Sequence, residues 1–422
     1  MKTPVAQRAT HQELLDIVRG SLAASGGGDR RLRMGMEMEF IPLTLDGRKR
    51  IPLDDKAGGA SGTKLLRQAA EGTGWIEEIS RHGVPQFRVP GTGIISFEPG
   101  GQLELSTEAF DSVLPLVSAS RHVLQTLHRA AGGLGIDLVA RGMDPFNTAR
   151  DASLFVRADR YRKQEAHYAS IGPWGRRMML QSAAIHVNLD LGGRPVRRWW
   201  VANRMAPYLI AIFANSPMCE GLVSGCRSSR AEQWRHLDPS RTGAFAESED
   251  PVSTYAAFAL EARDFLTQDE GTPARSFRQR WEAGAGVSEW SAHLTTLFPE
   301  VRPRGYLELR SFDALPPWWI AVPLVVSVGL LYAPRALSAA EDVLRDPTPN
   351  RLLVAGREGL ANADIQQRAT DLFDIALEGA VELGETVVGG AALEEARTFR
   401  DRFVRAGEDP GHESHKGDAP LP

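Results

Sequence analysis

The chain has 422 residues, of which 42% are hydrophobic and 24% are charged, and its formal net charge is -4. A chain of this size can bury a large core, and its length alone suggests about two or three domains. Charges of both signs are mixed throughout, which excludes the basic surface of a nucleic-acid binder, so we expect small-molecule partners. The two cysteines, Cys219 and Cys226, exclude a disulfide framework and a four-cysteine zinc site and favour a reducing cytoplasm.

Apolar residues at helical spacing predict a first helix over residues 11–22, which ends at a serine followed by glycines. A strand follows directly. The polar, turn-rich stretch 238–251 predicts a mobile loop and is our candidate for a lid over a site. The other elements expected in the first half of the chain are helices over 64–71, 112–131, 157–170 and 199–215 and a strand over 135–142.

The most hydrophobic run, 318–332, contains Pro323 and is too short to span a membrane, so it predicts a buried helix. The N-terminus has no uninterrupted apolar segment, which predicts no secretory signal, and we expect no membrane role. Helices over 317–332 and 361–406 are predicted to cover the back of a sheet. Residues 1–406 are expected to form a single catalytic domain, and residues 407–422 a disordered tail.

Four strand-like stretches, 35–40, 94–106, 184–190 and 306–311, carry charged or polar residues at alternate positions and mostly apolar residues between them. Successive side chains of a strand point to opposite faces, so Glu37 and Glu39 share a face while Met38 lies on the other. By the same count the acidic face also carries Glu104, His186, Asn188, Glu308 and Arg310. Amphipathic strands interleaved irregularly with helices predict an α+β fold with an antiparallel sheet.

Carboxylates packed on one face repel one another and need cations, and hard oxygen ligands favour Mg²⁺ or Mn²⁺. A single Glu-x-Glu strand is more often a solvated face, but repetition over four strands favours a metal site. Glu98 begins a Pro-Gly-Gly turn that places it at the rim, and His186 is interpreted as a ligand rather than a general base. For Arg310, an ion pair with a neighbouring glutamate is an equally good reading.

The sequence contains no Gly-rich phosphate loop of the Walker type and no dinucleotide-binding glycine motif. No nucleophile motif is present either. If the protein uses a nucleotide, metals held by the carboxylates are expected to bridge the phosphates, with arginines as the complementary cations.

Taken in order, six blocks of the sequence resemble the glutamate-cysteine ligase family, in the branch shared by plant-type and actinobacterial enzymes. They are GMEMEF, SFEPGGQLELS, IHVNLD, ANSP, SRAEQWRHLDPSRTG and HLTTLFPEVRPRGYLELR, and they extend over roughly two thirds of the chain, from about residue 33 to about residue 320. The last block looks most like the version that supplies γ-glutamylcysteine for ergothioneine.

The resemblance implies a glutamine-synthetase-like concave antiparallel sheet with helices on its outer face. It also implies ATP as co-substrate and two or three Mg²⁺ or Mn²⁺ ions, with L-glutamate and L-cysteine joined through a γ-glutamyl phosphate. Carried over by position, the metal ligands would be Glu37, Glu39, Glu98, Glu104, His186 and Glu308. Arg310 and Glu308 would be catalytic, and Arg230, Trp234, Arg241 and Asn188 would bind the nucleotide and substrates.

Three other readings remain open. A related carboxylate-amine ligase would use another acid or amine, because motifs do not report the pocket walls that set specificity. A catalytically silent nucleotide or amino-acid sensor would bind without turnover, although unused buried carboxylates are costly. A metal-dependent phosphohydrolase would release phosphate without an amine acceptor.

Overall fold

The centre of the molecule is a nine-stranded sheet in which every strand pair is antiparallel. The computed structural model describes residues 8–23, 32–54, 58–245, 250–267, 274–345 and 351–413. The strand order is β10-β11-β7-β1-β5-β4-β3-β2, and β6 pairs with the second half of β1. The strands are β1 Met34–Thr44, β2 Ile76–Ile79, β3 Pro85–Val89, β4 Gly93–Phe97, β5 Leu103–Thr107, β6 Ile136–Val139, β7 Ala184–Leu189, β10 Val301–Pro303 and β11 Leu307–Asp313; β8 Met218–Cys219 and β9 Leu222–Val223 form a separate hairpin.

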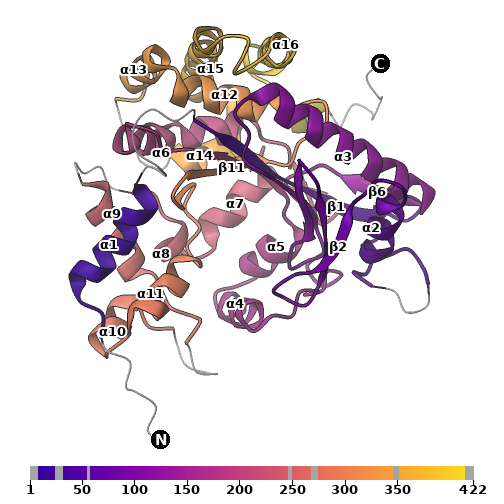
Figure 1. Ribbon diagram of the computed structural model, residues 1–422, viewed down its shortest axis with the longest axis horizontal. Helices are drawn as coiled ribbons and strands as arrows, with labels where there is room; N and C mark the ends of the chain where they lie inside the picture. Colours follow the sequence, from indigo (N-terminus) through magenta and orange to yellow (C-terminus); the bar gives the residue numbers. More distant parts are fainter. Residues whose placement is uncertain are drawn as a thin grey trace, which may run out of the picture.

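The apolar face of this sheet forms the main core. Met36 and Met38 of β1 and Leu105 of β5 are buried, as the alternation predicted, and their cluster continues into the helices. Helices α3, α6 and α12 contact the sheet, and Figure 1 shows α12, α15 and α16 gathered on one side of it. The predicted α+β fold with an antiparallel sheet and helices on its outer face is therefore confirmed.

Most predicted helices form close to their expected limits, and the hydrophobic run becomes α12, in which all twelve residues are buried. The stretch 361–406 is not one helix, because Gly384 adopts a φ of 80° and ends α15. The helices are α1 His11–Leu22, α2 Gly62–Ala70, α3 Val113–Gly133, α4 Asp159–Ala169, α5 Trp174–Gln181, α6 Pro195–Ile212, α7 Ser229–His236, α8 Pro239–Thr242, α9 Pro251–Glu261, α10 Phe277–Glu282, α11 Val287–Leu294, α12 Ala321–Tyr332, α13 Pro334–Val343, α14 Arg351–Glu358, α15 Ala363–Leu383, α16 Gly390–Phe399 and α17 Pro410–Glu413; η1 Gly359–Ala361 and η2 Arg400–Val404 complete the set.

Helices also enclose the acidic face, which the sequence did not predict. Residues of α1, α4, α5, α7, α9 and α11 line a cavity over that face. Part of the expected lid loop is instead a short helix: Asp238 caps α8, and both Asp238 and Arg241 are buried. Residues 238–242 are therefore not a loop, because their polar side chains bond inward, and residues 246–249 of the expected lid lie outside the described residues.

The predicted disordered tail is wrong for residues 407–413. Asp409 is buried, its carboxylate pairs with Arg227 at 3.2 Å, and the Gly411 N–H donates to the carbonyl of Ala214. The segment is ordered because these bonds and the short helix α17 fix it to the body. Residues 414–422 lie outside the described residues.

No single helix within the described ranges combines the length and apolarity needed to cross a membrane. Only α12 and α13 taken together are long and apolar enough, and they are bent by 93° relative to each other.

Replacing Asp409 with Asn is expected to flatten the dependence of stability on pH. Burial raises the pKa of Asp409 to about 6, although Arg227 opposes the shift. The folded state therefore binds more protons than the unfolded chain between about pH 4 and pH 6, and the free energy of unfolding falls as pH rises through that window. Urea titrations at pH 4 and pH 6 give the fall in the free energy of unfolding between the two pH values. This fall should be smaller in the variant by about 1 to 3 kcal/mol. The exposed control Asp111→Asn should show the same fall as the parent. An equally large fall in Asp409→Asn would contradict this account.

Candidate active site

The first cluster consists of Glu39, Glu98 and Glu104. Glu39 of β1 is paired with Glu104 of the neighbouring strand β5. Glu98 follows β4 in a tight turn, where its N–H donates to the Gln102 carbonyl at 2.9 Å and Gly101 takes a φ of 82°. One ligand atom from each of the three carboxylates lies within 4.8 Å of the other two. Glu98 therefore returns to the cluster from the rim.

The charge of this cluster is poorly compensated by the protein. Burial, with the nearby Glu104, raises the pKa of Glu39 to about 8. Burial, with the charge of Glu39, raises the pKa of Glu98 to about 7, and burial also raises the pKa of Glu104. The hydrogen bonds that this cluster receives include one from Ser106 Oγ to Glu104 at 2.6 Å and one from the Ala184 N–H to Glu39 at 2.9 Å. Such a carboxylate set fits a bound cation.

The second cluster contains Glu37, His186 and Glu308, whose ligand atoms also lie within 4.8 Å of one another. His186 faces Glu37 across β7 and β1, and its Nδ1 lies 2.7 Å from a Glu37 oxygen. Burial and the charge of Arg310 lower the pKa of His186. A neutral ring that donates from Nδ1 keeps the lone pair on Nε2, the form required of a metal ligand. Asn188 donates to the other Glu37 oxygen at 3.2 Å and so orients that carboxylate.

Glu308 differs from the other acids because arginines surround it. It is fully buried; Arg302 forms a two-pronged hydrogen bond with it, and Arg304 and Arg310 each lie 3.4 Å away. Although burial opposes ionisation, Arg302 and Arg310 hold the pKa of Glu308 well below its usual range. The ion pair that the sequence left open for Arg310 is thus present. Glu308 is consequently the acid whose oxygens have the least room for a metal.

Arg310 lies on an irregular part of β11. The register with β7 shifts between Leu309 and Phe312, which is a β-bulge that re-aims the side chains between them. The guanidinium lies over the rings of Trp234 and Phe298, 5.5 and 5.6 Å from their centroids. Arg230 donates to the Arg310 carbonyl at 2.8 Å and so fixes the backbone of the strand at this point. Aromatic walls of this kind hold a guanidinium in a defined plane.

A cavity of about 690 Å³ brings most of the predicted residues together. Asn188, which bonds Glu37, does not line it, and neither does the fully buried Arg241. The predicted residues that line it are Glu37, Glu39, Glu98, Glu104, His186, Arg230, Trp234, Glu308 and Arg310.

The sequence did not identify several cationic and polar groups of this wall. Arg81, at the turn between β2 and β3, and Arg160 of α4 line the cavity, as do Tyr161 and Gln164. None of these belongs to an alternating strand or a matched block, so no local signal could have found them. Together with the acidic face, they make a cavity in which carboxylates lie between groups of arginines. This arrangement is typical of enzymes that transfer phosphoryl groups with metal ions.

Comparison with known proteins shows the family of this chain. Residues 33–398 match the family described as glutamate-cysteine ligase family 2. The glutamate–cysteine ligase EgtA of Mycobacterium tuberculosis is 35% identical over 351 residues, covering 76% of this chain and 79% of the relative. The chloroplastic glutamate–cysteine ligase of Arabidopsis thaliana is 29% identical over 397 residues, covering 85% of this chain and 72% of the relative.

Among solved structures, the glutamate–cysteine ligase of Francisella tularensis in complex with AMP superimposes with a TM-score of 0.55 at 13% identity, covering 92% of this chain and 85% of that one. This likeness concerns the fold alone. The chain belongs to glutamate-cysteine ligase family 2. The resemblance that the six sequence blocks carried, to the plant-type and actinobacterial branch, is confirmed.

Proposed function

We propose that this protein joins the side-chain carboxylate of L-glutamate to the amine of L-cysteine, with ATP as co-substrate, and that the γ-glutamylcysteine formed supplies ergothioneine synthesis. One observation carries the proposal: in a chain of this family, nearly all the carboxylates and arginines expected of the site converge on one cavity. The names of the actinobacterial relatives support the choice of substrates. The two free cysteines support a cytoplasmic enzyme.

Magnesium or manganese ions, two or three in number, are proposed as the resident cations. Glu39, Glu98 and Glu104 fit this role best, because their pKa values are raised by burial and by mutual repulsion that a cation would relieve. Glu37 and His186, with Glu308 at the edge, would hold a further ion. When bound, such ions would neutralise the negative charge of the ATP phosphates and of the phosphoryl group in transfer.

The chain's own groups are proposed to bind and orient the three substrates. Arg310, fixed against Trp234 and Phe298, would contact the transferred phosphate or the glutamate carboxylate. Arg230 and Trp234 would form part of the nucleotide wall. An acyl phosphate hydrolyses in water, and the buried floor around Glu39, His186 and Glu308 would keep water away from it.

Residues 1–406 are proposed to act as one catalytic unit. The continuous core cluster, which extends from α1 through the sheet to η2, supports a single unit. The packed segment 407–413 belongs structurally to the same unit.

The proposal is tested by ADP release from purified protein with Mg²⁺, ATP and L-glutamate, with and without a panel of amines, and by the mass of the product. Release that requires both glutamate and cysteine, with γ-glutamylcysteine formed, is the expected result. Turnover with another acceptor would identify a related ligase instead. Phosphate release without any amine would identify a hydrolase, and nucleotide binding without turnover a sensor.

A further inference from the structure

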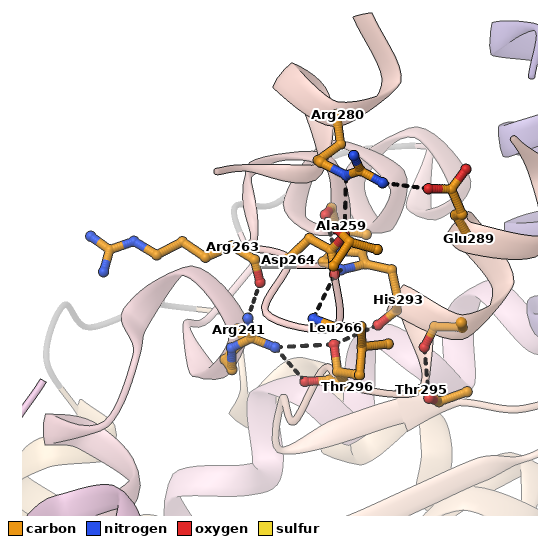
Figure 2. A network of polar contacts seen from close by, with 12 residues as sticks. Arg241, Ala259, Arg263, Asp264, Leu266, Arg280, Glu289, His293, Thr295 and Thr296 are labelled. Atoms are coloured by element: carbon orange, nitrogen blue, oxygen red, sulfur yellow. Dashed lines mark hydrogen bonds and ion pairs between the residues drawn. The ribbon is translucent and has the colours of Figure 1, made fainter. Parts of the chain in front are cut away.

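Arg241 is a fully buried arginine whose hydrogen bonds all go to the protein. Its Nε donates to Asp238 at 3.1 Å, and its Nη1 donates to both the carbonyl and the hydroxyl of Thr296 at 2.7 and 3.1 Å. Its Nη2 donates to the carbonyl of Arg263. Figure 2 shows this guanidinium between the Arg263 carbonyl on one side and Thr296 on the other. Four of its five N–H groups are thus bonded within the protein, and because the side chain is fully buried and does not line the cavity, Arg241 is not placed to contact a substrate.

The segment that Arg241 holds leads directly to the cavity. The Arg241 carbonyl accepts the Phe298 N–H at 2.9 Å, so one residue grips the chain at both Thr296 and Phe298. Leu294, Thr295 and Phe298 line the cavity. The structure thus connects a buried guanidinium to the cavity wall through two residues.

Phe298 in turn contacts the cationic groups of the site. Its ring packs on Trp234, with centroids 5.6 Å apart, and the guanidinium groups of Arg302 and Arg310 lie over it at 5.9 and 5.6 Å. Arg302 also donates to the Leu297 carbonyl at 3.3 Å, within the same segment. A displacement of this segment would therefore move Arg302 and Arg310, two of the three arginines that pair with Glu308.

The groups around Arg241 fix its own position. Asp238 also contacts His167 at 3.1 Å, and the Phe265 ring lies 4.7 Å below the guanidinium. On the far side of the network, Asp264 lies near Arg280 and His293, and Arg280 pairs with Glu289 on α11 (Figure 2). Arg280 is half-buried in the same layer of helices, but its ion pairs in the described part of the chain go to Asp264 and Glu289, whereas Arg241 bonds the Thr296–Phe298 segment.

We propose that Arg241 is a positioning residue: its hydrogen bonds to the carbonyl and the hydroxyl of Thr296 hold Phe298 against Arg310 and Arg302 and so set the geometry of the cationic wall. This inference deepens the proposed function and rests on it. It replaces the sequence-based expectation that Arg241 touches nucleotide. A planar fork is required, because a lysine ammonium cannot reach Asp238, Thr296 and Arg263 together.

The test combines Arg241→Lys and Phe298→Leu, singly and together, with kcat and KM measured for ADP release. Each single change is expected to lower kcat/KM by about tenfold, since small misplacements of binding groups are costly. If Arg241 acts through Phe298, the double variant should lose no more than the worse single variant, and both singles should change the same kinetic parameter. Multiplied losses, or a change in kcat for one and in KM for the other, would overturn the proposal.

Hydrogen–deuterium exchange supplies a readout that does not depend on ligase activity. Peptides covering residues 294–300 should exchange faster in Arg241→Lys than in the parent, while Arg280→Lys, from the same helical layer, should leave both this exchange and the kinetics unchanged. Unchanged exchange in Arg241→Lys would overturn the positioning role of Arg241, whichever reaction the enzyme catalyses. If the parent protein lacks ligase activity, only the proposed function is refuted. The exchange result then still decides whether Arg241 positions the 294–300 segment.

Discussion

Replacing Glu39 with Gln should lower kcat by about a thousandfold or more while leaving the protein folded. Glu39 has a ligand atom within 4.8 Å of ligand atoms of Glu98 and Glu104, in the cluster that fits a cation best. Glutamine keeps the acceptor for the Ala184 N–H but removes the negative charge that a divalent ion requires. Steady-state ADP release at saturating Mg²⁺ measures the effect.

The same substitution should also change the response of stability to metal. Without a divalent ion, Glu39→Gln is expected to be at least as stable as the parent, because burial and Glu104 make ionised Glu39 unfavourable. Mg²⁺ should raise the melting temperature of the parent more than that of the variant. The matched control is Glu77→Gln, an exposed glutamate on the edge strand β2, which should behave like the parent. Intact turnover and intact Mg²⁺ response in Glu39→Gln would refute the metal assignment.

Replacing Arg310 with Lys should cost about a hundredfold to a thousandfold in kcat/KM without unfolding the protein. The guanidinium plane is held by Trp234 and Phe298 next to Glu308, and a lysine ammonium offers a point charge in place of the fork. The loss should appear with ATP and glutamate saturating as well as limiting, since the proposed contact strengthens during phosphoryl transfer.

Arg121→Lys is the control for that change, because Arg121 is also a forked arginine, bonded to two carbonyls and to Glu395, and lies outside the cavity. It should retain parental kinetics. If Arg310→Lys also retained them and lost only stability, Arg310 would be a structural partner of Glu308 and nothing more.

The sequence predicted the acidic face well because that face depends on local alternation. Glu37 and Glu39 had to share a side of β1, and the pairing of β1 with β5 and β7 then had to bring Glu104 and His186 beside them. The turn after Glu98 was also readable, since Pro-Gly-Gly dictates its backbone.

Other parts of the site depend on contacts between distant segments. Nothing local indicates that Arg81 and Arg160 line the cavity, because one belongs to a turn and the other to a polar helix. The bulge after Leu309 leaves no mark in the pattern of β11. Arg241 lies in a matched block. That block alone could not distinguish a residue that lines the cavity from a buried residue that supports the cavity wall.

The most direct test of the central claim follows oxygen from glutamate to phosphate. With L-glutamate labelled by ¹⁸O in its γ-carboxylate, attack of that oxygen on the γ-phosphorus of ATP and displacement of ADP give a mixed anhydride. Attack of the cysteine amine on its carbonyl carbon then releases phosphate carrying the bridging oxygen. Mass spectrometry should find one ¹⁸O in each inorganic phosphate formed with γ-glutamylcysteine. Phosphate that instead takes its new oxygen from water would contradict the ligase mechanism.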